Sequence, residues 1–518
     1  MTNKLCSILS HPFCPQQKKI MPHARFTQGS TLRHIIVMSL SNAIGLTAMF
    51  FVDMLDLFFL SLLGEKHLAA AVGYAGTILF LTTSIGIGIA ITAGALISKA
   101  IGEGNKYKAH QLMVNVAALC FLFTTIIAAT IWIYIPELLT LVGAHEEVHF
   151  LASQYLNIVV PSMPIMALAM SFSAALRAVG DAKRSMSSTL AGGTVNAVLD
   201  PIFIFALNMG IEGAAIASVL ARVAILLMSS YGVIKVHKLM GRFNWNEFKN
   251  DRATIINMAV PAIMTNLATP VGSVFITRAI ANYGDGFVAG YAIIGRIIPV
   301  AFSIVFALSG AVGPIIGQNY GARLMGRVRQ SLKDAYWFST VYILALSLII
   351  YLTQDYLIFL FNAKGNAAEL IRFFCTFVAI SFTFNGMLFI ANAAFNNLGK
   401  PTWSTAFNWG KATIGTIPFV VVGANLGGVY GILMGQALGG VLFALAALYC
   451  SFKLVLHKEQ HMAEIQKTML PANLDPKDMP LPRSLNPLSS ECAQMCQMAE
   501  EAECEEHLLD EVAGQNSR

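Results

Sequence analysis

The ten residues NAVLDPIFIF, at positions 196–205, place an aspartate and a proline side by side inside an apolar run. Apolar residues continue on both sides over positions 185–207, which is typical of a helix that crosses a membrane. An ionised Asp at the centre of such a helix costs about 2.5–3.5 kcal/mol on insertion scales. We therefore treat this stretch as a candidate functional site.

The composition predicts a polytopic membrane protein. Hydrophobic residues make up 56% of the 518 positions and charged residues only 12%, whereas soluble domains carry about 25% charged residues. Twelve apolar runs are long enough to span a bilayer: 34–63, 68–98, 112–135, 150–176, 185–207, 211–234, 255–282, 288–320, 335–361, 371–397, 403–423 and 428–452. We expect an all-α fold with twelve transmembrane helices.

The charges between these runs predict an orientation. Lys and Arg collect in alternate breaks, such as 99–108, 235–252 and 323–333, and the other breaks carry mainly Asp and Glu. Because basic loops stay in the cytoplasm, we expect both termini to be cytoplasmic, in a bacterial-type inner (plasma) membrane. The eight cysteines are scattered without a zinc-like spacing, so we expect no disulfide framework and no structural metal.

The two halves of the chain are internal copies. GALISKAIG (94–102) aligns with GPIIGQNYG (313–321), and AALRAVGDAK (174–183) with AAFNNLGKPT (393–402), both at an offset of 219 residues. Pro201 aligns with Pro418 at an offset of 217, which sets Ile417 where the first half has Asp200. Six helices per half preserve the topology, so the repeat is parallel, as in secondary transporters that bind substrate between the halves.

These features predict five segments of the chain. They are a cytoplasmic leader (1–32), an N-lobe (33–240), a cytoplasmic linker (241–254), a C-lobe (255–455) and a polar, disordered cytoplasmic tail (456–518).

Four polar residues are predicted to lie at one depth in the N-lobe. Counting about 1.5 Å per residue from the loop ends brings Asp56, Asn196, Asp200 and Ser218 to a common level, with Asp53 one turn deeper as a possible accessory. Two nearby carboxylates in a low dielectric cannot both ionise cheaply. The group is thus a candidate site for an exchangeable H⁺, although the same oxygens could bind Na⁺ at Asp56 and Asp200.

Pro201 is the candidate bending point of this site. It lacks an N–H, so the Ala197 carbonyl loses its helical partner and the helix can kink there. A protonated Asp200 donates a hydrogen bond and an ionised one only accepts, so a change in its charge could alter helix packing.

A substrate cavity is predicted from methionine, aromatic and amide side chains, which adapt to varied apolar ligands. Its candidate residues are Met54, Met163, Met166, Met170, Asn266, Thr269, Phe275, Phe384 and Asn385. The sequence contains no HExxH motif, no Walker-type loop and no GxSxG elbow. We therefore expect no enzyme activity and no cofactor, and a coupling ion (H⁺ or Na⁺) as the energy source.

Over residues 33–455 the sequence resembles the multidrug and toxic compound extrusion (MATE) family. The resemblance rests on DLFFLSLLGEKHLAAAVG (56–73), LRAVGDAK (176–183), NAVLDPIFIFALNMGIEGAAIAS (196–218), GYAIIGRI (290–297) and GPIIGQNYGARLMGR (313–327). It implies two six-helix lobes and export of cationic or amphipathic drugs in exchange for H⁺ or Na⁺. The family's N-lobe ion site maps to Asp56, Asn196, Asp200 and Ser218, and the GQNYGAR stretch is closer to the DinF-like branch.

The sequence departs from the family in the C-lobe, where Thr269 and Asn385 stand at two positions that are acidic in many members. This shifts the expected ion site to the N-lobe. The expected partners are small organic cations or amphipathic drugs and membrane lipid, without nucleic acid, and the expected state is a monomer. A flippase for lipid-linked precursors or polysaccharides is the alternative function, and it would need an Arg- and Lys-rich cavity.

Overall fold

The computed structural model describes residues 24–62 and 66–469, and within these ranges the chain is helical without any strand. The first half contains α1 (Thr31–Leu62), α2 (Lys66–Gly102), α3 (Lys106–Ile133), α4 (Ile135–Leu141), α5 (Glu146–Val159), α6 (Met163–Ala178), α7 (Ala182–Pro201) and α8 (Gly210–Tyr231). The short 3-10 and π-helical segments of this half are η1 (Arg25–Thr27), η2 (Val160–Ser162), η3 (Ile202–Ala206) and η4 (Gly232–Val236).

The second half follows the same order of helices. It contains α9 (Trp245–Ala281), α10 (Asp285–Ala301), α11 (Ser303–Gly321), α12 (Met325–Leu352), α13 (Gln354–Leu360), α14 (Asn366–Phe373), η5 (Phe374–Val378), η6 (Ala379–Ser381), α15 (Phe382–Asn397), α16 (Pro401–Ala412) and α17 (Ile417–Met469). One compact unit of the chain ends at Gln460. The first 23 residues of the predicted leader and residues 470–518 of the predicted tail lie outside the described ranges.

The predicted all-α fold with twelve spans in two lobes is confirmed. Ten described helices are long and apolar enough to cross a membrane, and α10 and α11 form one further span that bends by 44°. The last of the ten, Pro401–Glu464, contains two predicted runs. The chain leaves helical geometry between these runs at Gly427 and at Gly428, whose φ of 57° is in the left-handed region.

The two helices on either side of Gly428 pack with their backbones in contact. A Cβ atom added to Gly439 would lie 1.4 Å from the Gly415 carbonyl oxygen, and one added to Gly423 would lie 2.0 Å from that of Gly431. Small residues let membrane helices approach this closely, and packing is a main source of their association. Glycine is therefore required along this contact.

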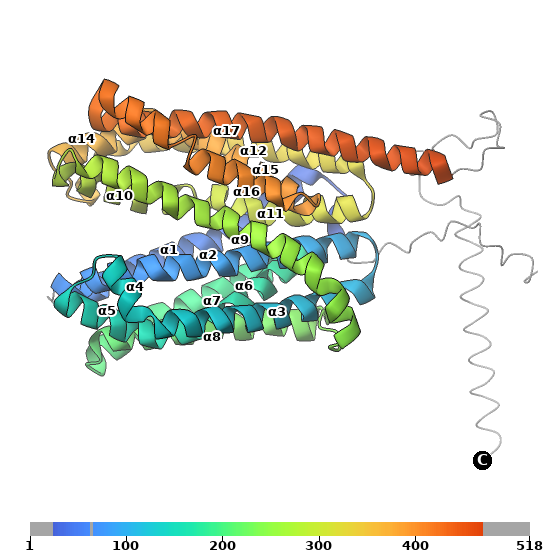
Figure 1. The fold of residues 1–518 in the computed structure, drawn as a ribbon, viewed down its shortest axis with the longest axis horizontal. Coiled ribbons are helices and arrows are strands. Elements are labelled where there is room, and N and C mark those ends of the chain that lie inside the picture. The colour runs from blue at the N-terminus through green and yellow to red at the C-terminus, as the bar shows by residue number, and fades with distance from the viewer. Residues whose placement is uncertain (1–23, 63–65, 470–518) are drawn as a thin grey trace, which may run out of the picture. The chain divides into compact units, whose positions relative to one another are not determined.

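The first helix of each lobe packs against both lobes. α1 packs on α7 of its own half and on α11 of the other, and α9 packs on α16 of its own half and on α2 of the other. Figure 1 shows α9 crossing from one group of helices to the other. Ile255 and Ile263 of α9 belong to the N-lobe core, whereas Ile276 belongs to the C-lobe core. The first turns of the predicted C-lobe are thus packed in the N-lobe.

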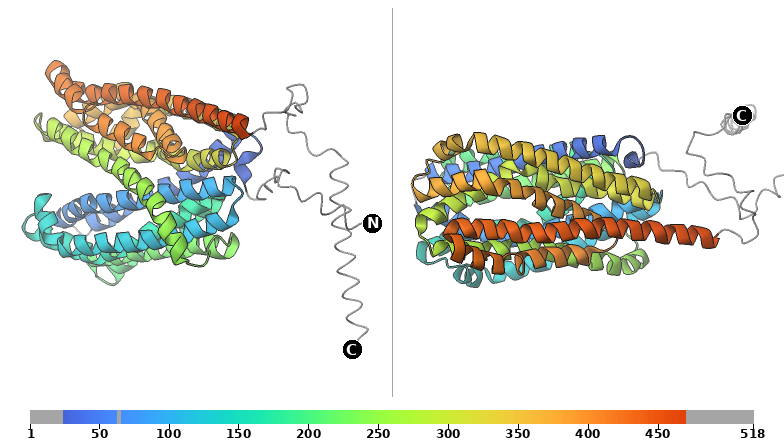
Figure 2. Two further views of the ribbon diagram at one scale, coloured as in Figure 1. Left: turned by 45° about the vertical axis from the view of Figure 1, so that its right-hand side comes forward. Right: turned by 90° about the horizontal axis from the view of Figure 1, so that it is seen from above.

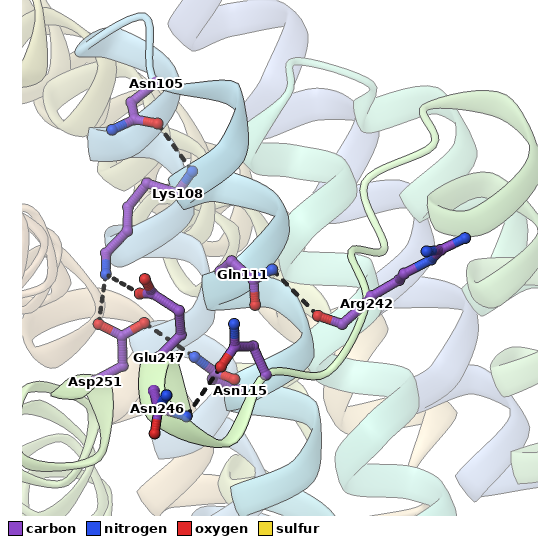
Figure 3. A network of polar contacts seen from close by, with 9 residues as sticks. Asn105, Lys108, Gln111, Asn115, Arg242, Asn246, Glu247 and Asp251 are labelled. Atoms are coloured by element: carbon purple, nitrogen blue, oxygen red, sulfur yellow. Dashed lines mark hydrogen bonds and ion pairs between the residues drawn. The ribbon is translucent and has the colours of Figure 1, made fainter. Parts of the chain in front are cut away.

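The predicted linker 241–254 is mostly helical and is fixed to α3. Its last ten residues are the first turns of α9. The buried Asp251 accepts hydrogen bonds from Lys108 Nζ at 2.7 Å and from Asn115 Nδ2 at 3.0 Å (Figure 3). Separating α9 from α3 would leave this buried charge without its partners, which is strongly destabilising, so the start of α9 is anchored on α3.

The lobes meet at the end of the molecule that carries the basic loops. A Cβ atom on Gly102 would lie 2.1 Å from the Gln318 carbonyl oxygen, and Gln318 Nε2 donates to the Ala178 carbonyl at 2.7 Å. The left view of Figure 2 shows the two groups of helices together at this end and separating toward the other. Phe26, near the end of the predicted leader, is buried here, and its N–H donates to Gln318 Oε1 at 3.0 Å.

Candidate functional site

Asp200 is fully buried near the end of α7, and Asn196 is buried one turn before it. The Nδ2 group of Asn196 donates to Asp200 Oδ2 at 2.9 Å and to Asp56 Oδ1 of α1 at 3.3 Å. The close packing of α7 on α1 brings these side chains together. Three of the four residues predicted for the ion site therefore form one hydrogen-bonded cluster.

The second oxygen of Asp200 defines the chemistry of this cluster. Asp200 Oδ1 is buried and has no hydrogen-bond donor among the described residues, while the Asp56 and Asp200 carboxyl groups interact directly. Two such groups in apolar surroundings repel each other unless a proton or a cation neutralises one of them. The residues fit either ion, and Asn196 presents its N–H₂ group to the carboxyl groups.

Ser218 lies close to this cluster but contacts a different partner. It is half-buried on α8 and lies beside the hydroxyl of Tyr155, a buried residue of α5. Tyr155 in turn lies within electrostatic range of both Asp56 and Asp200. The structure therefore places Ser218 beside the carboxyl pair through Tyr155, which the sequence analysis did not identify.

Arg222 is a second residue that the sequence analysis missed. It lies one turn after Ser218 on α8, and its Nη1 donates to Ser162 Oγ at 2.8 Å and to the Val159 carbonyl at 3.2 Å. It thereby holds the break between α5 and α6, and its charge interacts with that of Asp53. The signal was available, because an Arg inside the apolar run 211–234 is as costly as an Asp.

Helix α7 changes its hydrogen bonding directly after Pro201. The backbone passes from α-helix to the π-helical segment η3, whose five residues end at Ala206. Pro cannot donate to the preceding turn, and π-helical turns are often found at functional sites. The predicted irregularity thus lies beside Asp200. In the C-lobe the corresponding chain is broken between α16 and α17, just before Pro418.

The residues predicted to line a substrate cavity are not gathered at one place. Met163 belongs to the N-lobe core, and Phe275 packs against the C-lobe core. Met54 and Thr269 are exposed, Met166 and Met170 are half-buried on α6, and Asn266 donates to the Ala262 carbonyl at 2.8 Å. Phe384 and Asn385 line a cavity inside the C-lobe.

This C-lobe cavity contains a lysine that the sequence analysis did not single out. The ammonium group of Lys411, on α16, donates a short hydrogen bond to Asn385 Oδ1. Its sequence signal is a lone Lys within the apolar run 403–423. No carboxylate is among the described residues that line the cavity.

Asp181 caps α7 outside the membrane spans, at the end where the lobes meet. Its carboxylate accepts from the Arg184 N–H at 3.2 Å and pairs with His237 Nε2 at 2.8 Å. Burial by itself would raise the pKa of Asp181, but the hydrogen bonds from His237 and Arg184 outweigh burial and hold the pKa well below its usual range. This cap joins the start of α7 to the end of the sixth span.

The architecture and the buried polar groups are those of a polytopic membrane transporter built from a repeat. The MatE family matches the chain twice, over residues 42–202 and 261–422, so that the matches begin 219 residues apart. The chain therefore belongs to the MatE family, whose members are transporters. The predicted offset of the repeat is confirmed. The chain is a membrane transporter rather than an enzyme.

Individual relatives are similar over most of the chain. A protein of Shewanella oneidensis named FAD transporter is 27% identical over 80% of this chain and 93% of its own length. The multidrug export protein MepA of Staphylococcus aureus is 22% identical over 82% of this chain and 94% of its own length. The crystal structure of a mutant of the Vibrio cholerae MATE transporter VcmN superposes with a TM-score of 0.79 at 24% identity, covering 82% of this chain and 97% of that chain.

Proposed function

We propose that the protein is a secondary active exporter of cationic or amphipathic organic compounds, including drugs, in exchange for H⁺. The observation that carries this proposal is the Asp56–Asn196–Asp200 cluster, in which two carboxyl groups share one amide and Asp200 Oδ1 has no donor among the described residues. A proton on this pair removes the repulsion of the two charges. The similarity to MepA supports drug-like substrates.

The position of the cluster supports coupling by alternating access. A proton enters while the lobes are separated at the outer end, neutralises the pair and is released when the lobes rock to open the other end. Each unit of ΔpH supplies about 1.4 kcal/mol per proton, and the membrane potential adds about 2.3 kcal/mol per 100 mV for each net positive charge that the exchange moves inward. The π-helical segment after Pro201 provides a point at which α7 can repack when Asp200 changes charge.

The lobes meet at the end that carries the basic loops, and basic loops favour the cytoplasm. On this assignment the protein has both termini in the cytoplasm of an inner (plasma) membrane and is open to the outside. It would work as a monomer in lipid, because each lobe is complete within one chain.

Proton is favoured over Na⁺ by the contacts of Asn196. Its N–H₂ group points to both carboxyl groups, so it donates hydrogens where a bound Na⁺ would need an oxygen ligand. The Na⁺ alternative is tested with the same preparation.

The test is drug efflux from vesicles with an imposed ΔpH or, separately, an imposed Na⁺ gradient. We expect the wild type to respond to ΔpH and Asp200→Asn to lose export while it still inserts into the membrane. Asp355→Asn is the matched control, since Asp355 is an exposed carboxylate outside this cluster. Full ΔpH-driven export by Asp200→Asn would refute the coupling site, and export driven by Na⁺ alone would replace the ion.

A second candidate function is export of a flavin nucleotide. It is favoured by the 27% identity to the FAD transporter of Shewanella oneidensis over most of both chains. Flavin fluorescence outside FAD-loaded vesicles would measure it, and an absence of ΔpH-dependent release would exclude it.

A further inference from the structure

The C-lobe contains a cavity of about 70 Å³ that opens among α10, α15, α16 and α17. Its wall is mainly apolar and aromatic, including Phe374, Phe382 and Phe384. Five polar residues line it: Tyr291, Ser381, Asn385, Lys411 and Gln436. Small-molecule sites have this character, with an apolar wall and a few convergent polar groups.

Lys411 is the charged group of this cavity. A lysine ammonium has three hydrogen-bond donors, and the contact that the structure gives it is with the Asn385 amide oxygen. The ion pairs of the described residues do not include Lys411, and the described cavity wall has no carboxylate. A cation within a membrane is costly unless an anion or a polar group accompanies it.

A lysine with a purely structural role is paired differently in the same molecule. Lys108 contacts Asp251 at 2.7 Å and Glu247 at 3.6 Å, and Asn115 completes the pairing of Asp251. Lys411 has a neutral amide where Lys108 has carboxylates. The C-lobe therefore provides a positive charge without supplying the negative charge that balances it.

We propose that this cavity binds the anionic group of an organic substrate, a carboxylate or a phosphate monoester attached to an aromatic ring. Lys411 balances the charge, and the amides of Asn385 and Gln436 flank it. Gln436 lies beside Tyr291 in the cavity wall. Whole drug-sized ligands need cavities of roughly 300–1,000 Å³, so the cavity takes the anionic group and the adjoining part of the ring, which lies against the phenylalanine wall.

This inference rests on the proposed export function and adds a class of substrate to it. The added substrates are anions, which the N-lobe carboxyl groups would repel. Its test needs no ion gradient. If the binding fails, the antiport coupling at Asp200 still stands, and if the coupling fails, the binding result is unaffected.

The experiment measures binding to the purified full-length protein in detergent by fluorescence polarisation. The probes share one ring system: 1-naphthoate, 1-naphthyl phosphate and the cation 1-naphthylmethylammonium. The variants are Lys411→Met, which removes the charge, Lys411→Arg, which preserves it, and Asn385→Asp, which supplies an internal carboxylate. Lys400→Met is the matched control, because Lys400 is exposed at the start of the same helix.

We expect Lys411→Met to weaken binding of at least one anionic probe by about tenfold or more, as loss of a charge-assisted contact does, while the cation binds as before. Lys411→Arg and Lys400→Met should retain binding, and Asn385→Asp should lose it. The probe that responds more strongly identifies carboxylate or phosphate as the preferred group.

Unchanged anion affinity in Lys411→Met, an equal loss for the cation, or no anion binding by the wild type would overturn the proposal. If Lys411→Met elutes as aggregate in size-exclusion chromatography, the anion affinity of Asn385→Asp is the test. Lost anion binding would support the proposal, and unchanged anion binding would overturn it.

Discussion

The two lobes carry opposite charges on equivalent helices. In the N-lobe, α7 contributes Asn196 and the buried Asp200 to a carboxyl pair. In the C-lobe, the repeat offset of 217 puts Ile417 at the place of Asp200, and α16 contributes Lys411 six residues earlier. The duplicated fold has thus been preserved while the charge inside each lobe diverged, because each of these groups interacts within its own lobe.

The lobes also differ in how their last two helices pack. In the C-lobe the contact is between backbones, with Gly439 against the Gly415 carbonyl. In the N-lobe the equivalent spans also have a backbone contact, between Gly213 of α8 and Phe203 of η3, but Gly192 of α7 lies against the side chain of Ile225. A side chain can move to accept an added methyl group, whereas a helix backbone cannot, so Gly439 tolerates less change than Gly192.

The largest effect is expected from Gly439→Ala. Its Cβ would lie 1.4 Å from the Gly415 oxygen, so the two helices must separate, and overpacking of this kind costs about 3 kcal/mol or more. Gly192→Ala should cost roughly 1–2 kcal/mol, because Ile225 can adjust. Thermal unfolding midpoints in detergent measure both, and equal midpoints for the two variants would contradict the comparison.

The next largest effect is a loss of ΔpH-driven export, which is expected for changes in the N-lobe carboxyl pair but not at the equivalent C-lobe position. Asp56→Asn and Asp200→Asn should each reduce ΔpH-driven export by about 100-fold, and the double variant should be no worse, because the pair acts as one proton-binding unit. The control is Ile417→Val, at the C-lobe position equivalent to Asp200, which should export normally. Export rates in vesicles measure the cycle, and additive losses would show that the carboxyl groups act independently.

A smaller effect is expected from Arg222→Gln, which removes the bonds to Ser162 and the Val159 carbonyl and a charge that interacts with Asp53. We expect export to fall about tenfold, with a shifted pH profile and partial recovery in Arg222→Lys. At the equivalent level the C-lobe has Gly439 and Gly440, so the arginine is a feature of the N-lobe alone. A wild-type rate and pH profile in Arg222→Gln would restrict Arg222 to a packing role.

The smallest effect concerns the helix starts. α7 is capped by Asp181, whereas the equivalent α16 begins after Lys400 without a side-chain cap. Asp181→Asn should destabilise the protein by about 1 kcal/mol at pH 7.

The stabilisation that Asp181 provides depends on pH, and the lowered pKa of Asp181 sets the direction of this dependence. The stabilisation is complete above the pKa of the unfolded carboxyl, about 3.9, and is lost as the pH falls through the lower pKa of the folded state. Unfolding midpoints of wild type and variant should therefore converge below pH 4. A difference that persists at acidic pH would mean that the charge of Asp181 does not provide the stabilisation.

Much of the site was accessible to sequence reasoning because an intramembrane charge is conspicuous. Asp56, Asn196 and Asp200 were predicted together from depth, and the structure joins them through one amide. Ser218 was predicted at the right level, but its contact with Tyr155 was not, since depth says nothing about which way a side chain turns. Arg222 and Lys411 carried the same signal and were missed.

The residues predicted to line a substrate cavity do not lie together, because they were selected by residue type. Methionines and phenylalanines at helical spacing face lipid, the protein core or a cavity with equal ease, and the three surroundings are all apolar. Phe384 and Asn385 line the C-lobe cavity, whereas Met163 is in the N-lobe core.

The sequence by itself determined the twelve spans, the duplicated lobes and the presence of a carboxyl pair. These follow from hydrophobic length, from the register of the repeat and from the cost of a charge in lipid, which are properties of the chain alone. Only the tertiary structure decided that α9 is shared between the lobes, that Asn196 bridges Asp56 and Asp200, and that Lys411 meets Asn385. Those contacts depend on how each helix is rotated and crossed against its neighbours, and an apolar pattern in an apolar solvent does not specify that rotation.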